Sequence, residues 1–384
     1  MKLKRLEFLD SLRGLAAAYV VVYHMILIPD PHLSVPGWAA KFANAGGSGV
    51  MLFFVISAFS LYYTMPLRLK DSYPKLSFYL HRYFRIAPLF YAWMLFSLIR
   101  DAWYYSAHHS VVSIVESLTF TFNLTTQGQQ GFVWASWTVG IEMLFYVMFP
   151  LVYKLVDDIW RATALVFILI LCWMAYQAII PYIYGPETAP VVAEWTFVRF
   201  LPIFAMGCVV HFVIKGIQAR GSSPSDESIG LMLVTVSTFS YLALLNGRLN
   251  IFFMDARLWQ GLIYTVMTVG LCLNPLKAIV NRFTVYLGKI SYSLYLGHTT
   301  VVLFLIPVYR FIYGYVSTTT IAFLLCYALT LALGIGLSDL TYRFIEAPGV
   351  RYGKVVYRWF AENRGNVARL DGSDSGDPVK DIRR

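Results

Sequence analysis

The chain has 384 residues, of which 58% are hydrophobic and only 14% are charged, and its mean hydropathy is +0.60. This composition excludes a soluble globular enzyme and indicates an integral membrane protein. The formal net charge is +10. Because the positive charges flank apolar segments, they indicate orientation in a membrane and not binding to nucleic acid.

Ten apolar stretches are long enough to cross a bilayer as helices. An eleventh, 111–124, is short and carries Glu116 among several polar residues, so we expect an interfacial or re-entrant helix there. The first stretch is not a removable signal peptide, because no small-residue cleavage site follows it. The sequence thus predicts an all-α, polytopic integral membrane protein of about ten transmembrane helices. The expected spans lie near 12–30, 46–66, 86–100, 134–153, 161–182, 195–214, 229–246, 257–274, 290–312 and 318–342.

The lysine and arginine residues predict that both termini are cytoplasmic. With the N-terminus inside and 111–124 not crossing, 25 of the 31 Lys and Arg residues lie on the cytoplasmic side, as the positive-inside rule requires. Counting 111–124 as a span would move Lys154 and Arg220 outside. After the last span we expect a basic cytoplasmic tail over 349–384 that is disordered beyond about residue 362.

The first apolar stretch carries an arginine and a histidine. Asp10 and Ser11 are suited to cap its helix, which would place Arg13 in the first turn, where a cation opposes the helix dipole. Asp10 or a ligand phosphate would offset that charge; a snorkelling arginine at the headgroups is the alternative. His24 follows about 16 Å along the helix, near the middle of the membrane. It is either a neutral histidine bonded to a carbonyl group or a general base in catalysis.

Two further arginines lie on the same side of the membrane as Arg13. Arg82 and Arg85 are three residues apart, so they share one face of a helix. One arginine would be an ordinary cytoplasmic anchor, whereas three that converge would form a phosphate-binding rim. The glycines at 46, 47 and 49 permit either close helix packing or an anion-binding turn.

The fourth span supplies a carboxylate, and the ninth a second histidine. Glu142 lies about 9 Å inside its apolar helix, so it is protonated or paired with Arg or His, in a catalytic or a purely structural role. His298 shares a helix with Tyr292, whereas His211 is interpreted as structural. All cysteines lie in predicted spans without a Cys-x-x-Cys pair, so we expect small packing residues there. They are Cys172, Cys208, Cys272 and Cys326.

Several ordered segments carry a family signature. Arg13 and His24 form an Arg-(x)10-His pattern, Arg82 to Pro88 reads Arg-x-x-Arg-(Ile/Leu)-x-Pro, and Trp137 to Pro150 contains Trp-Thr-Val-x-x-Glu-x-x-Phe-Tyr-x-x-x-Pro. With Gly49–Phe59, Ile290–His298 and Phe344–Pro348, the chain resembles the membrane-bound acyltransferase-3 family from residue 8 to 348. One departure, Ala58 where the family usually has Gly, concerns helix packing and leaves the chemistry unchanged.

The resemblance implies a transmembrane acyltransferase-3 domain over 1–348, located in a bacterial inner membrane. Its implied activity is transfer of an acyl group, commonly acetyl, from cytoplasmic acyl-CoA to a hydroxyl of a cell-surface or exported polysaccharide or oligosaccharide. The partners would be the lipid bilayer, acyl-CoA (acetyl-CoA) as co-substrate and the glycan acceptor, without a metal or nucleic acid.

The resemblance also implies roles for single residues. His24 would act as general base, and Glu142 would orient it. Phosphates of CoA would bind Arg13, Arg82 and Arg85. Substrate contacts are expected from His298, Tyr292, Trp137 and Tyr146, and a structural role from Asp10.

Three alternatives stay open. A transporter-like carrier of acyl groups or glycans would also contain intramembrane His, Glu and Arg, but it should show inverted repeats or broken helices, and neither is evident. Transfer could be direct or could pass through an acyl-enzyme, with His24 itself as one candidate nucleophile. Acceptor contacts should come from the outer segments, whose aromatic residues suit sugar rings and equally the membrane interface. These segments are 31–45, 101–133, 183–194, 247–256 and 313–317.

Overall fold

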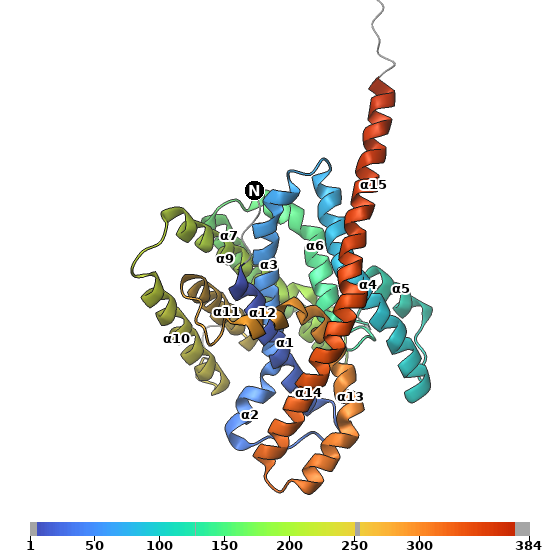
Figure 1. The fold of residues 1–384 in the computed structure, drawn as a ribbon, viewed down its shortest axis with the longest axis vertical. Helices are drawn as coiled ribbons and strands as arrows, with labels where there is room; N and C mark the ends of the chain where they lie inside the picture. Colours follow the sequence, from blue (N-terminus) through green and yellow to red (C-terminus); the bar gives the residue numbers. More distant parts are fainter. Residues whose placement is uncertain (1–5, 127, 250–253, 373–384) are drawn as a thin grey trace, which may run out of the picture.

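The computed structural model describes residues 6–126, 128–249 and 254–372, and this part of the chain contains helices and no strand. The all-α prediction is confirmed. Most helices gather in one bundle, with α1 at its centre, and α15 extends away from it (Figure 1). The helices are α1 Glu7–Leu27, α2 Gly37–Asn44, α3 Gly49–Arg68, α4 Pro74–Tyr104, α5 Val111–Thr119, α6 Trp137–Leu155, α7 Ile159–Ile183, α8 Ala189–Trp195, α9 Leu201–Arg220, α10 Asp226–Leu245, α11 Ala256–Leu273, α12 Arg282–Lys289, α13 Ser291–Tyr315, α14 Thr319–Thr341 and α15 Ala347–Gly372.

Eight helical stretches of the described residues are long and apolar enough to cross a membrane, which confirms a polytopic membrane protein. Two expected spans, α1 and α4, are not among the eight. Both are long, at 21 and 31 residues, but each carries several ionisable side chains that lower its mean hydropathy. In α1 these include Asp10, Arg13 and His24. Four of the candidate site residues, Asp10, Arg13, Arg82 and Arg85, therefore lie on the two long helices that fall outside the eight stretches.

The segment 111–124 forms two short helical pieces, as expected for a stretch that does not cross. Ser110 caps α5, because its Oγ accepts a hydrogen bond from the Ser113 amide at 3.1 Å. The second piece is the 3-10 turn η2, Phe122–Leu124. The sequence did not predict the short helices α2, α8 and α12.

Glycines allow α1 to lie in close contact with its neighbours. A side chain at Gly49 would come within 2.6 Å of the Ala16 carbonyl, and one at Gly14 within 2.7 Å of the Gly288 amide. These contacts support the interpretation of the glycines before α3 as helix-packing residues.

The start of α1 differs from the prediction. The helix begins at Glu7, and the residue before it, Leu6, makes no side-chain capping bond. Asp10 and Ser11 therefore lie inside the helix, and Arg13 lies in its second turn. Charged residues in a first turn do not prevent helix formation. The helix can therefore begin before the apolar run does.

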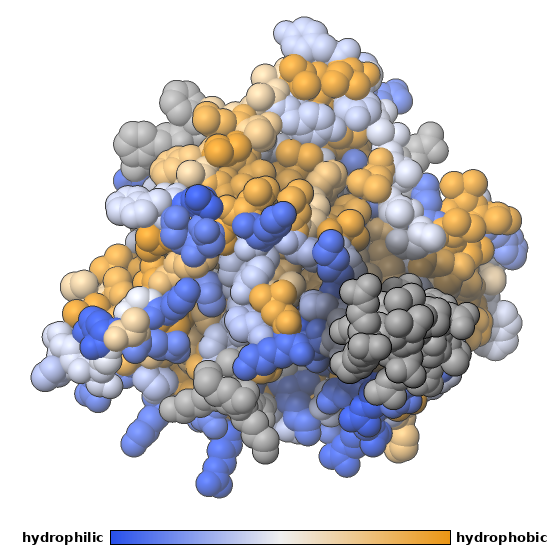
Figure 2. Space-filling model, turned by 90° about the horizontal axis from the view of Figure 1, so that it is seen from above, coloured by the Kyte–Doolittle hydropathy of each residue, from blue (hydrophilic) through white to orange (hydrophobic). Residues whose placement is uncertain are grey.

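The C-terminal helix extends further than the sequence suggested. A π-helical turn, Tyr342–Glu346, joins α14 to α15, which continues to Gly372. The helix thus covers ten residues beyond 362; residues 373–384 lie outside the described part of the chain. Figure 2 shows the face from which α15 projects, with hydrophilic side chains distributed between apolar patches.

The four cysteines lie in helices, as expected. Cys208 and Cys326 are buried, Cys272 is half-buried and Cys172 is exposed, and all four are free.

Candidate active site

A cavity of about 770 Å³ lies where α1, α3, α4, α6 and α13 meet. Its volume is typical of small-molecule sites, which range over about 300–1,000 Å³. Its wall combines apolar side chains with an unusual number of charged, hydroxyl and phenol groups for a membrane bundle. The polar and aromatic polar members are Asp10, Arg13, Ser57, Ser60, Tyr63, Thr64, Arg82, Arg85, Thr138, Glu142, Tyr146, Ser291, Tyr292 and Tyr295.

Arg13 is held at the cavity wall by two neighbours. Its Nη2 donates to Ser60 Oγ at 2.6 Å, and its Nη1 lies 3.5 Å from Asp10 Oδ1. The pair with Asp10 is the contact that the sequence suggested, and it sits one helical turn before Arg13. Asp10 thus offsets part of the arginine charge while the guanidinium lines the cavity.

Arg82 is the least neutralised of the three arginines. It donates to Thr64 Oγ1 at 3.1 Å, and its guanidinium lies 5.5 Å from the Tyr146 ring centre. Among the described residues, no carboxylate lies within ion-pair distance of Arg82. A hydroxyl and an aromatic face leave its positive charge available to an anion.

Arg85 lines the same cavity and forms an ion pair with Glu346. The Glu346 side chain is fully buried, and its second oxygen accepts from Ser293 Oγ at 2.7 Å. Glu346 belongs to the C-terminal motif Phe344–Pro348, but its partner could not be predicted from the motif. The pair fixes α4 against the junction of α14 and α15.

Glu142 faces the cavity and not His24. Its Oε1 accepts hydrogen bonds from Ser57 and Tyr146, both at 2.5 Å. Glu142 therefore lines the cavity with Tyr146, and the contact to His24 that we expected of it comes from another residue.

That residue is His298. Its Nε2 lies 3.0 Å from His24 Nδ1, which also lies 3.1 Å from the Val20 carbonyl oxygen. His298 Nδ1 lies 2.6 Å from the Tyr295 carbonyl oxygen. Because both carbonyls can only accept, each Nδ1 carries a hydrogen, and His298 Nε2 accepts from His24. This arrangement leaves His24 Nε2 with a free lone pair, as a general base needs.

His24 lies near the C-terminal end of α1. It belongs to the last turn of the helix, about 26 Å along the axis from Glu7. The separation from Arg13 remains about 16 Å, so the two residues mark opposite ends of the site.

Tyr295 separates the cavity from the imidazole pair. Its ring lines the cavity and lies 5.7 Å from both the Phe53 and the His298 rings. Its hydroxyl donates to the Ala135 carbonyl at 3.0 Å and accepts from Thr138 at 2.8 Å. Neither His24 nor His298 is among the described residues that line the cavity. The cavity therefore ends at Tyr295, one helical turn before His298.

The remaining predicted substrate residues are divided between the cavity and the packing around it. Tyr146 and Tyr292 line the cavity, and the Tyr292 hydroxyl donates to the Ile86 carbonyl at 2.8 Å. Trp137 instead packs against Trp195 and Phe200, with ring centres 5.1 and 5.2 Å apart. Trp137 therefore supports the start of α6 and does not face the cavity.

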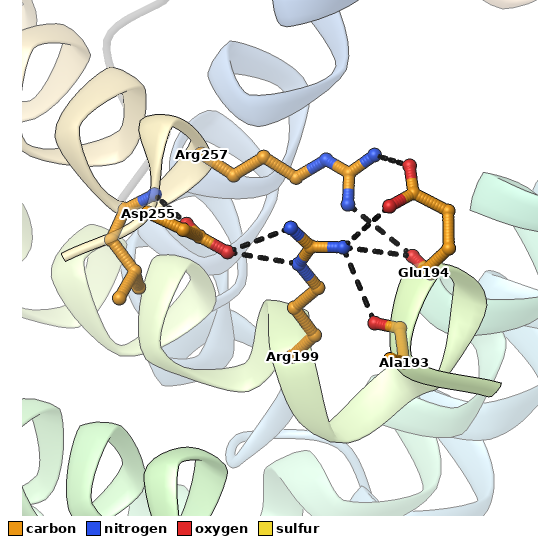
Figure 3. Close-up of polar contacts among 6 residues, drawn as sticks. Ala193, Glu194, Arg199, Asp255 and Arg257 are labelled. Carbon is orange, nitrogen blue, oxygen red and sulfur yellow. Dashed lines mark hydrogen bonds and ion pairs between the residues drawn. The ribbon is translucent and has the colours of Figure 1, made fainter. Parts of the chain in front are cut away.

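An ion-pair cluster holds the short helix α8 beside these aromatic rings (Figure 3). Arg199 Nη1 lies 2.7 Å from Glu194 Oε2, and its Nη2 lies 2.8 Å from Asp255 Oδ2. Arg257 completes the cluster through a second pair with Glu194. The cluster joins α8, the turn before α9 and the start of α11. The sequence pattern did not predict that these three segments are in contact. Among the described residues, no group of three or more His, Cys, Asp or Glu side chains could hold a metal ion.

Comparisons with known proteins find a family model and several relatives that match most of this chain. The family model described as an acyltransferase domain matches residues 6–339. The O-acetyltransferase OatA of Staphylococcus aureus (strain NCTC 8325 / PS 47) is 22% identical, in an alignment that covers 94% of this chain and 60% of that protein. The putative acetyltransferase ORF330 of Acidianus two-tailed virus is 26% identical, covering 75% of this chain and 81% of the viral protein. The chain thus spans about three-fifths of the length of the staphylococcal relative. No solved structure shows a significant match.

Proposed function

Because this chain belongs to the acyltransferase-3 family of membrane-bound acyltransferases, we propose that it transfers an acetyl group from cytoplasmic acetyl-CoA to a hydroxyl of a cell-surface or exported glycan. The relatives named as O-acetyltransferases support the acetyl group and the oxygen acceptor. We propose that the chain lies in a bacterial inner membrane with both termini in the cytoplasm. In this orientation 25 of its 31 Lys and Arg residues lie on the cytoplasmic side, as the positive-inside rule requires.

The observation that carries the proposal is the convergence of Arg13, Arg82 and Arg85 on one cavity. Coenzyme A carries a pyrophosphate and a ribose phosphate, and arginine binds phosphate through charge-assisted hydrogen bonds. Arg82 would bind most directly, because its own partners are a hydroxyl and an aromatic ring. The apolar remainder of the cavity would receive the pantetheine arm.

His24 would act as the general base. As the acceptor oxygen attacks the thioester carbonyl, its proton moves to His24 Nε2, the C–S bond breaks, and coenzyme A leaves as a thiolate that takes this proton from the His24 imidazolium. The imidazolium of His24 would be stabilised by His298 Nε2 through the 3.0 Å contact. Since Tyr295 closes the cavity on the His24 side, we infer that this ring moves when the thioester reaches the base.

An acyl-enzyme remains the competing order of events. Acetyl transfer to an enzyme nucleophile would release coenzyme A before the acceptor binds. Incubation with radiolabelled acetyl-CoA without acceptor distinguishes the two: direct transfer leaves the protein unlabelled, whereas an acyl-enzyme would carry one label per chain.

Replacing His24 tests the assignment. In protein purified into nanodiscs, we expect His24→Ala to lower the rate of acetyl transfer by about 10²–10⁴-fold, with unchanged yield and acetyl-CoA binding. The control is His108→Ala, since His108 is exposed on an outer segment. Full activity of His24→Ala would overturn the general-base assignment.

A further inference from the structure

A second cavity, of about 280 Å³, lies at the end of α4 opposite to the arginines. Its wall includes His109, Glu116, Gln129, Phe132 and Val191, and it shares no lining residue with the first cavity. From Arg85 to Tyr104, α4 rises about 29 Å, so the second cavity is on the outer side of the bundle. Its volume is close to the lower end of ligand sites, about 300 Å³, which suits one small ring.

A buried side chain in this cavity has an unused hydrogen-bond acceptor. Gln129 is only 6% exposed, and its Oε1 has no hydrogen-bond partner among the described residues. A buried amide oxygen without a partner is unfavourable in the free protein, and a ligand hydroxyl would supply the missing donor. The Gln129 main chain is fixed, because its carbonyl accepts from Asn123 Nδ2 at 2.7 Å.

The other lining groups favour a neutral polyhydroxyl ligand. Glu116 offers a carboxylate acceptor, and Gln130 offers a side-chain amide that both donates and accepts. The Phe132 ring stacks on His109 with centres 4.2 Å apart, which adds an apolar face. No Lys or Arg is among the described lining residues, and the carboxylate of Glu116 would repel a phosphate or carboxylate ligand.

The cavity is held by contacts that do not depend on a ligand. His109 Nε2 lies 2.8 Å from Asp101 Oδ2, which fixes the imidazole at the wall. Val191 comes from α8, the helix that the ion pairs of Glu194 secure (Figure 3). Gln129 and Phe132 belong to the segment that leads to α6. Further along this segment, the Ala135 carbonyl accepts a hydrogen bond from the Tyr295 hydroxyl. The second cavity is thus a preformed site joined by main chain to the closed end of the first.

We propose that this second cavity binds one neutral sugar ring of the acceptor glycan, as an anchoring subsite away from the unit that is acylated. The inference rests on the proposed function, because it assigns the acceptor to the outer side. Hydroxyls of the ring would pair with Gln129 Oε1 and Glu116, and its C–H face would lie on Phe132.

Two variants and two matched controls test the subsite. The test variants are Gln129→Leu and Glu116→Gln; the controls are Gln177→Leu and Glu187→Gln, which change exposed residues of the same types outside both cavities. The probe is surface polysaccharide of the native strain, stripped of its acyl esters by mild alkali. Two readouts are needed: equilibrium binding of this polysaccharide, and initial rates of acetyl transfer in nanodiscs.

For each test variant we expect the KM for polysaccharide to rise about tenfold or more, with matching loss of binding. The KM for acetyl-CoA, the melting temperature and both controls should stay unchanged. Unchanged binding of polysaccharide in Gln129→Leu would overturn the subsite, and so would an equal rise in the KM for acetyl-CoA. If wild-type protein binds polysaccharide through Gln129 yet transfers no acetyl group, the proposed function fails and the subsite stands; if it binds none, the subsite fails.

Discussion

His24 and His298 form a hydrogen-bonded imidazole pair, with 3.0 Å between His24 Nδ1 and His298 Nε2, although 274 residues separate them in the chain. The Val20 and Tyr295 carbonyls fix the ring hydrogens, so His298 accepts from His24. In a serine-protease triad a carboxylate holds the equivalent position. A neutral imidazole at this position would orient the proposed base without placing a further charge in the bundle.

We expect His298→Ala to lower kcat about 10²-fold with little change in the KM for acetyl-CoA. The reason is that His24 loses its orienting acceptor while the arginine cavity stays intact. His298→Gln, whose amide oxygen can accept from His24 Nδ1, should recover part of that loss. Steady-state kinetics of purified protein decide the matter, with His211→Gln as control because His211 lies on α9 outside the cavity. Equal kcat in His298→Ala and wild type would contradict the orienting role.

Arg82→Ala should raise the KM for acetyl-CoA about tenfold or more, the effect of losing roughly 1.5–3 kcal/mol from a charged hydrogen bond. Acetyl-pantetheine has no phosphate, so its KM should be the same in variant and wild type. The control is Arg161→Ala, because Arg161 is 58% exposed and pairs with Asp157 at 3.0 Å on the surface. If acetyl-pantetheine use falls as much as acetyl-CoA use, Arg82 does not bind phosphate.

Glu346→Gln should destabilise the protein by about 1.5–3 kcal/mol, because it removes the carboxylate charge from the contact with Arg85, whose own side chain is 36% exposed. The double variant Arg85→Met/Glu346→Leu should regain most of that stability. Its affinity for acetyl-CoA should be lower than that of the wild type, because Arg85 is absent. Thermal unfolding in detergent measures the first effect, and equilibrium binding of acetyl-CoA the second. For comparison, Asp157→Asn breaks an exposed pair and should cost less than about 1 kcal/mol. A wild-type melting temperature for Glu346→Gln would show that the pair contributes little.

Gly288→Ala should destabilise the contact between α1 and α12 by about 1–3 kcal/mol, because its methyl group would overlap the main chain of Asp10. Gly336 has open space where a side chain would begin, so Gly336→Ala should be neutral or stabilising by up to about 1 kcal/mol through higher helix propensity. Melting temperatures of the two variants provide the comparison. Similar values for both would mean that α12 can shift away from α1 at no cost.

The sequence by itself determined the environment and the helical class, and it predicts the side of the membrane that the arginines occupy. These properties depend on local quantities: the length of an apolar run, the charges beside it, and the spacing of Arg82 and Arg85 on one helix face. The same local pattern was wrong about the start of α1, because the helix extends through charged residues before the apolar run.

Only the tertiary structure decided which polar groups meet. His24 pairs with His298, Arg85 with Glu346 from 261 residues away, and Glu142 with Ser57 and Tyr146. Each partner depends on how its helix is rotated and how closely it packs, which is set by contacts such as those at Gly14 and Gly288. The hydropathy of the sequence does not depend on these rotations, because an ionisable residue lowers the mean hydropathy equally whichever way its side chain points.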